Sequence, residues 1–267
     1  MNVYLQVVLL GALQGFTEFF PVSSSGHLVL AQYFMGMQEP EIFLDLILHM
    51  GTLVAVLLFL HKEVLLIIKG LWAQGEEGQK GRRLLLMIIV ATIPTALMGF
   101  GLRAQFEAMF ASLSVVGCAL LVTGILLLLT KLYASHKDIG LMAMPWLYAV
   151  IIGIAQGFAI TPGLSRSGTT ICIALLLGLN RELSFKFSFL LSIPAILGAV
   201  LLESIKMYRL PPDPAALSAL PLIVGAMVAG LCGILALSLM NKLVKTGQIY
   251  GFFPYCLLLG VIALWAG

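Results

Sequence analysis

Charged residues are scarce in this sequence. Aspartate, glutamate, lysine and arginine make up 10% of its 267 residues, whereas soluble globular domains carry about 25%. The net charge of +3 is too small for a nucleic-acid-binding surface, so we expect no nucleic-acid partner. The four cysteines stand singly in apolar runs without CxxC spacing, so we expect neither disulfides nor metal binding from them. No basic segment precedes the first apolar run, so we expect no cleavable signal peptide.

Hydrophobic residues make up 61% of the chain, a composition typical of an all-α polytopic membrane protein. Several apolar runs approach the length that crosses a hydrocarbon core of about 30 Å. The predicted spans are 43–61, 84–102, 112–130, 186–203, 217–240 and 249–266. Between them we expect a charged amphipathic loop at 62–83, a short loop with Arg103 and Glu107, and a polar linker at 131–140.

Two further apolar regions are interrupted by polar turns. In the first, runs at 3–19 and 27–36 flank the turn Pro21–Gly26, and we expect the second helix to start near Gly26. In the second, 145–180, the break is TPGLSRSG at 161–168. Each half is too short to span the membrane, so each region is predicted to be a re-entrant pair of helices that enters and leaves on one side.

The two interrupted regions resemble each other. When they are aligned, the matching residues are Gly11, Gln14, Gly15, Phe16, Ser23, Ser25 and Gly26 with Gly153, Gln156, Gly157, Phe158, Ser165, Ser167 and Gly168. We therefore predict one membrane domain, 1–267, of two repeats at about 1–139 and 140–267, each a re-entrant pair plus three transmembrane helices. Three crossings are an odd number, so the repeats should have inverted topology, with the two tips facing each other near the membrane midplane.

Lysine and arginine are divided unevenly between the connections. One side collects Lys62, Lys69, Lys80, Arg82, Arg83, Lys131, Lys137, Arg181, Lys186, Lys242 and Lys245. The other side collects Arg103, Lys206 and Arg209. The positive-inside tendency makes the first side cytoplasmic, so both termini and the mouth of the first pair are predicted to lie outside.

The polar residues of the two tips have the chemistry of a phosphate site. Gln14 and Glu18 are four residues apart and share one helix face. Helix N-termini with serine hydroxyls bind anions, and Arg166 offers a guanidinium that can hold a phosphate bidentately. The candidate binding residues are Gln14, Ser23, Ser25, Ser165, Ser167 and Thr169. A hydroxyl nucleophile, acid/base groups in Glu18 and His27, and the Arg166 cation together supply what hydrolysis of a diphosphate requires.

Simpler interpretations stay open for these residues. The serines could cap helices and nothing more, and His27 could be a packing residue. Glu18 and Arg166 could form a structural ion pair in the core. Asp45 and His49, four residues apart on the first span, could orient the site or form a solvated pair at a helix end.

The motifs QGFTEFFPVSSSGH (14–27) and PGLSRSG (162–168) resemble those of the undecaprenyl-diphosphate phosphatase family, also called the bacitracin-resistance protein. LDLILHMGT (44–52) and FSFLLSIPAILGA (187–199) extend the resemblance over essentially the whole chain. The first family motif is Glu or Gln, three residues, then Glu. Here Gln14 cannot exchange a proton, so it takes a supporting role and Glu18 is the carboxylate of the motif.

The resemblance implies removal of the terminal phosphate from a C55 polyprenyl diphosphate, which returns the lipid carrier to peptidoglycan synthesis. It implies a multi-pass protein of the bacterial plasma (inner) membrane with its site open to the outer face, and it allows a homodimer. It also implies a divalent cation, Mg²⁺ or Ca²⁺, bound with the substrate diphosphate and with Glu18 as a ligand.

The resulting hypothesis assigns Ser24, the family's nucleophile position, to attack on the terminal phosphorus. Glu18 and His27 would move protons, and Arg166 would hold the phosphates. Attack by a water molecule activated by Glu18 or His27 is an alternative.

A transporter or flippase of polyprenyl phosphate is the rival function, because inverted repeats with broken helices are typical of transporters. A structural scaffold would leave the duplicated polar tips unexplained.

Overall fold

The computed structural model describes residues 2–36, 42–110, 112–134, 137–208 and 219–266. Within these ranges the regular structure is helical, with a single β-bridge between Ile139 and Leu179. The all-α prediction is therefore confirmed. Arg209, part of the predicted charge asymmetry, lies outside the described residues.

Four helices in the described chain are long and apolar enough to cross a membrane. They are α5 (Gly75–Gly101), α7 (Leu113–Tyr133), α10 (Arg181–Tyr208) and α11 (Ala219–Lys245). A fifth crossing is reached if α3 (Ile42–Phe59) is joined to α4 (His61–Gly70), which is bent from it by 74°. Large side chains such as Leu97 and Leu235 stay exposed on these helices, and a bilayer would cover them. The chain is a multi-pass membrane protein.

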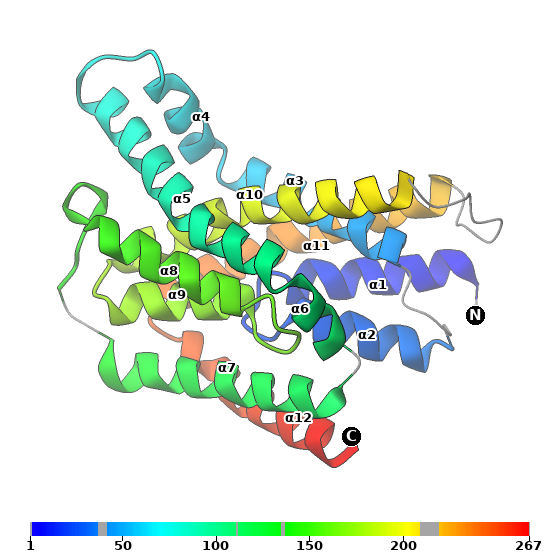
Figure 1. Ribbon diagram of the computed structural model, residues 1–267. Coiled ribbons are helices and arrows are strands. Elements are labelled where there is room, and N and C mark those ends of the chain that lie inside the picture. The colour runs from blue at the N-terminus through cyan, green and yellow to red at the C-terminus, as the bar shows by residue number, and fades with distance from the viewer. Residues whose placement is uncertain (1, 37–41, 111, 135–136, 209–218, 267) are drawn as a thin grey trace.

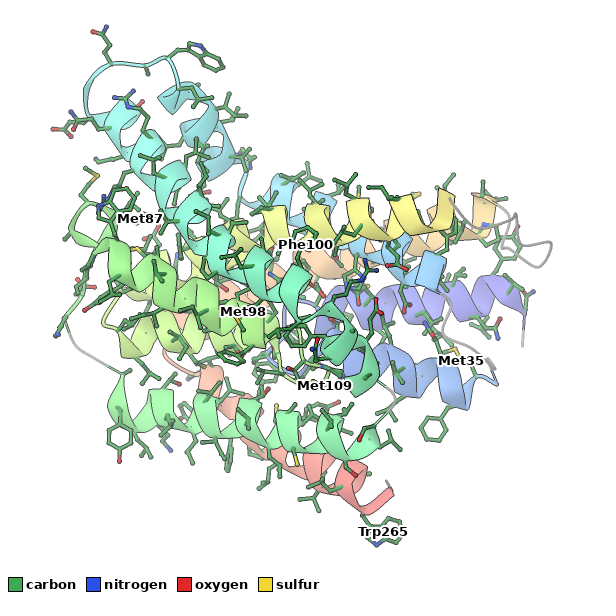
Figure 2. All side chains as sticks on the ribbon, viewed as in Figure 1. Met35, Met87, Met98, Phe100, Met109 and Trp265 are labelled. Carbon is green, nitrogen blue, oxygen red and sulfur yellow. The ribbon has the colours of Figure 1, made fainter. Side chains whose placement is uncertain are left out.

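The last predicted span, 249–266, is helical over its whole length but is not one continuous α-helix. It consists of a 3-10 turn, η2 (Ile249–Phe252), followed by α12 (Phe253–Ala266). Pro254 lies in the first turn of α12, where its missing N–H has no helical partner to lose. Figure 2 shows Trp265 extending away from the end of α12, where this side chain is 90% exposed.

The prediction of a loop at 62–83 was wrong. This segment is a helical hairpin made of α4 and the first turns of α5. Gly70 and Gly81 bring the two backbones into direct contact. The Arg82 guanidinium donates hydrogen bonds of 2.8 Å to the carbonyls of both Gly70 and Ala73, which closes the turn. The predicted loop around Arg103 is likewise a short helix, α6 (Arg103–Met109).

Both interrupted regions form pairs of short helices. The first pair is α1 (Val3–Thr17) and α2 (Ser24–Phe34), and the second is α8 (Trp146–Phe158) and α9 (Arg166–Leu176). The helix expected near Gly26 thus begins two residues earlier, at Ser24. Figure 1 shows that α1 and α2 open toward the end where α12 finishes, whereas α8 and α9 open toward the end where α4 meets α5.

Each pair is supported by a long helix from the other half of the chain. Helix α1 packs on α11, and α8 packs on α5. Glycines make these contacts close: a Cβ on Gly15 would lie 2.6 Å from the Ala229 carbonyl oxygen, and one on Gly153 would lie 2.0 Å from that of Ala91. The backbones of α1 and α8 therefore rest directly on their supports, and this brings the two tips together in the interior.

Candidate active site

The two tips satisfy each other's backbone. The N–H of Gly163 donates to the Ser23 hydroxyl at 3.1 Å, and the Ser167 hydroxyl donates to the Phe20 carbonyl at 3.3 Å. Thr123 of α7 adds two bonds, because its hydroxyl accepts from the N–H of Ser165 and donates to the Gly163 carbonyl. Broken helices at membrane depth require such partners, since lipid provides none.

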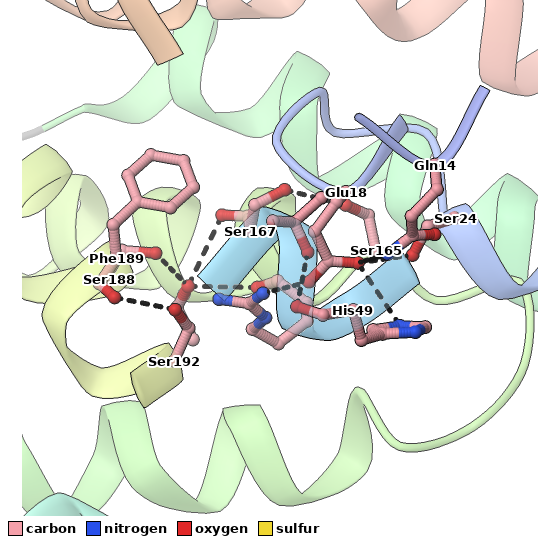
Figure 3. Close-up of polar contacts among 12 residues, drawn as sticks. Gln14, Glu18, Ser24, His49, Ser165, Ser167, Ser188, Phe189 and Ser192 are labelled. Atoms are coloured by element: carbon pink, nitrogen blue, oxygen red, sulfur yellow. Dashed lines mark hydrogen bonds and ion pairs between the residues drawn. The ribbon is translucent and has the colours of Figure 1, made fainter. Parts of the chain in front are cut away.

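An ion pair joins the tips at their centre. The Nη2 atom of Arg166 donates to Oε1 of Glu18, and the two side chains are 16% and 7% exposed. The other oxygen of this carboxylate, Oε2, accepts the Ser24 hydroxyl at 2.7 Å and the Gln14 amide at 3.2 Å (Figure 3). The structure thus places Gln14, Glu18, Ser24 and Arg166 in one cluster.

Arg166 has a hydrogen-bond donor that is not used. Its Nη1 atom is buried and has no hydrogen-bond partner. An unpaired buried N–H group of a cation is costly, and an oxyanion bound beside it would remove that cost. Arg166 also begins α9, whose N-cap is Ser165: the Ser165 hydroxyl accepts from the N–H of Gly168 at 3.1 Å.

A cavity of about 440 Å³ lies against this cluster. Its polar lining residues are Thr17, Glu18, Ser23, Ser24, Ser25, Asp45, His49, Ser165, Arg166 and Glu203. Its apolar lining residues are Leu46, Phe110, Ala159, Ile160, Leu164, Ala195, Ile196, Ala199 and Val200. The lining therefore offers polar groups for a phosphate and apolar side chains for a hydrocarbon chain.

The backbone is strained where the first tip turns into α2. Ser23 has a φ of +69°, in the left-handed region that residues with side chains rarely adopt. Its hydroxyl also contacts the Ser25 hydroxyl at 3.3 Å, and the matching pair Ser165 and Ser167 has the same contact at 3.2 Å. This turn directs Ser24 toward Glu18.

His27 does not line the cavity. Its Nδ1 atom lies 2.7 Å from the Ser23 carbonyl oxygen and its Nε2 atom 2.5 Å from the Tyr255 hydroxyl. Its ring is stacked on that of Tyr255, with centroids 5.7 Å apart. Both ring nitrogens are therefore engaged in joining α2 to α12. The turn at Ser23 directs the His27 side chain away from the cavity. This geometry gives no support to the predicted proton transfer by His27.

Of the histidines that the structure describes, His49 is the one that reaches the cavity, and the sequence left its role open. Its Nε2 atom lies 3.6 Å from Oε2 of Glu18, and its Nδ1 atom lies 2.7 Å from the Asp45 carbonyl oxygen. Gln32 donates to the Asp45 carboxylate at 2.6 Å. The signal in the sequence was the spacing of Asp45 and His49, which puts two polar side chains on one face of an apolar helix.

Three of the predicted binding residues lie behind the cavity wall rather than in it. Gln14 supports Glu18 through its amide, and Ser167 connects the tips. Thr169 is buried, and its hydroxyl has no partner. Ser23, Ser25 and Ser165 do line the cavity.

Glu18 does not fit the predicted role of metal ligand in this arrangement. Both of its oxygens already accept hydrogen bonds, and one of the donors is a guanidinium cation that would repel a metal. In the described part of the chain, no group of three or more histidine, cysteine, aspartate or glutamate side chains is placed to hold a metal ion.

The chain resembles known proteins over nearly its whole length. It matches the family model described as bacitracin resistance protein BacA over residues 7–262. An undecaprenyl-diphosphatase of Desulfatibacillum aliphaticivorans is 42% identical over 274 residues, which cover 98% of each chain. Its counterpart in Carboxydothermus hydrogenoformans is 43% identical and covers 99% of this chain and 97% of its own, and the one in Methanosphaera stadtmanae is 38% identical and covers 97% and 96%. The chain belongs to the bacitracin resistance protein BacA family.

Proposed function

We propose that the protein is a membrane phosphatase that hydrolyses undecaprenyl diphosphate to undecaprenyl phosphate and inorganic phosphate. The observation that carries this proposal is the Ser24 hydroxyl, which is bonded to a carboxylate whose other oxygen pairs with Arg166. This cluster lies beside a cavity lined by both polar and apolar residues. The relatives named undecaprenyl-diphosphatase support the same reaction. The undecaprenyl phosphate produced is the lipid carrier that returns to cell-wall synthesis.

The first chemical step follows from the contacts of Ser24. Its oxygen attacks the terminal phosphorus while its proton passes to Oε2 of Glu18, 2.7 Å away. The bond between that phosphorus and the bridging oxygen breaks, and the lipid monophosphate leaves with the electron pair. Arg166 supplies charge stabilisation through Nη1, and such electrostatic positioning is the main source of rate in phosphoryl transfer.

The apolar wall of the cavity supports a lipid substrate. Ala195, Ile196, Ala199 and Val200 form one face of α10 along the cavity. The first units of a polyprenyl chain would pack there while the rest of the chain stays in the bilayer. The partners we propose are thus the polyprenyl diphosphate and the membrane; a homodimer stays a prediction from the resemblance.

We also propose that the two halves are repeats of inverted topology in the bacterial inner membrane. The opposite openings of the two short-helix pairs and the exchanged packing of α1 on α11 and α8 on α5 support this. Cationic residues of α4, α5 and the end of α11 gather at the end of the molecule opposite both termini (Figure 1). That end would be cytoplasmic by the positive-inside tendency, and the cavity would open to the outer face.

A flippase that uses the same site is the second candidate, but one contact favours the enzyme. A transporter has no need for a hydroxyl bonded to a carboxylate at its anion site, whereas a nucleophile requires it.

A divalent cation is proposed to arrive with the substrate. Phosphate oxygens and water would supply most of its ligands, because Mg²⁺ is usually bound through substrate phosphates and few carboxylates. No step above depends on it.

Replacing Ser24 by alanine tests the nucleophile. We expect kcat for phosphate release to fall by at least roughly 10⁴-fold, since removing the serine nucleophile of subtilisin costs about 10⁶-fold. Binding of the diphosphate should persist because Arg166 is unchanged. Ser238→Ala is the matched control, since this exposed hydroxyl on α11 contacts only its own helix in the hydrogen bonds described. Near-normal turnover by Ser24→Ala would exclude the nucleophilic role.

Chelation tests the cation. EDTA should abolish phosphate release by the purified protein, and Mg²⁺ or Ca²⁺ should restore it. Because the described residues form no preformed site, the melting temperature without substrate should be the same with EDTA and with the metal. A rise in melting temperature caused by the metal alone would contradict a substrate-borne cation.

Labelling from each side tests the orientation. In a chain whose native cysteines are replaced, Gln74→Cys on the exposed turn between α4 and α5 should react with an impermeant maleimide only after cells are opened. Asn2→Cys, before α1, should react in intact cells. The reverse pattern would overturn the proposed orientation.

A further inference from the structure

We propose that His49 is a catalytic base of the second chemical step, in which water hydrolyses a phosphate group held on Ser24. This inference rests on the proposed phosphatase function and on Ser24 as the nucleophile. His49 lies on α3, outside the two polar tips.

The need for a second base follows from counting protons. In the first step Glu18 accepts the proton of Ser24. In the second step the Ser24 oxygen leaves phosphorus with the electron pair and takes that proton back from Glu18. The attacking water must lose a proton at the same time, as its oxygen forms the new bond to phosphorus, and Glu18 cannot accept it while it still holds the first one.

Of the other described ionisable groups on the cavity wall, the ion pairs bring two to Glu18, namely Arg166 and His49. The ionisable lining residues besides Glu18 are Asp45, His49, Arg166 and Glu203. Arg166 does not deprotonate in proteins. Asp45 accepts a hydrogen bond from Gln32, and Glu203 pairs with Arg103 at 3.7 Å. Of the histidines that the structure describes, His49 is the one that lines the cavity.

The contacts of His49 fix the required tautomer. The Asp45 carbonyl oxygen can only accept, so the Nδ1 atom of His49 carries the hydrogen in their 2.7 Å contact. In the neutral ring this leaves the lone pair on Nε2, which points to the site. A base needs that lone pair, and the side chain is 30% exposed, which leaves room for water.

The position of Nε2 also fits the reaction. Oε2 of Glu18 lies 2.7 Å from the Ser24 hydroxyl and 3.6 Å from Nε2 of His49. Nε2 and the Ser24 oxygen can therefore be no further apart than these two distances together, so His49 lies within reach of a water that attacks a phosphoryl group on Ser24. When Glu18 returns its proton to Ser24 it becomes an anion beside the newly formed imidazolium, and the two opposite charges stabilise each other.

His49→Gln separates the two steps. Glutamine keeps a polar side chain of similar length but cannot accept the proton. In rapid mixing with undecaprenyl diphosphate, the first-turnover burst of lipid monophosphate should persist, whereas steady-state phosphate release should fall by about 10²–10⁴-fold, the usual contribution of a general base. Phosphate should accumulate on Ser24 toward one per chain, as read by mass spectrometry.

His61→Gln is the matched control. His61 makes the same kind of contact, Nδ1 to the Leu58 carbonyl oxygen at 2.8 Å, but it is exposed at the start of α4 and does not line the cavity. This variant should turn over like the wild type.

The possible outcomes distinguish the role of His49 from the proposed phosphatase function. Wild-type phosphate release by His49→Gln, or equal loss of burst and steady state without phosphorylated Ser24, would overturn the role of His49 and leave the phosphatase in place. A wild-type protein that releases no phosphate from the lipid would overturn the function itself.

Discussion

The helix pairs α1–α2 and α8–α9 each break at a buried tip, and each break leaves backbone groups that need a partner within the protein. The rest of the structure depends on how they are satisfied. Ser23 accepts from Gly163 and Ser167 donates to Phe20, so each tip completes the other. The Glu18–Arg166 ion pair crosses the same junction, and either charge alone would be expensive to bury. The residues that hold the tips together are therefore the residues that make the site.

Close helix packing at two glycines fixes the position of the two tips. Gly15 of α1 faces α11, and Gly153 of α8 faces α5, so α1 and α8 rest backbone to backbone on long helices. Behind the tips, the rings of Phe19 and Phe189 meet edge to face with centroids 5.5 Å apart. A site carried by rigid supports of this kind keeps its donors in place for a charged substrate without reorganisation.

The sequence predicted the helical class, the two broken regions and most of the polar cluster, because serine, glycine and charge stand out against an apolar background. It assigned proton transfer to His27 and left the role of His49 open. The choice between the two histidines depends on the positive φ of Ser23 and on Tyr255, far along the chain, which together direct the His27 ring away from the cavity. The helical hairpin of α4 and α5 was missed because its many charges suggested a loop, whereas Arg82 and the paired glycines close it as helix.

The joining of the tips by Glu18 and Arg166 is the central claim, and a double-mutant cycle on stability tests it most directly. Melting of Glu18→Gln, Arg166→Gln and the double variant would be compared with the wild type in one detergent. Each single change leaves a buried charge unpaired, which costs about 3–5 kcal/mol, so the double variant should be destabilised by much less than the two single effects combined. Strictly additive losses would mean that the two side chains do not interact and that the tips do not meet as described.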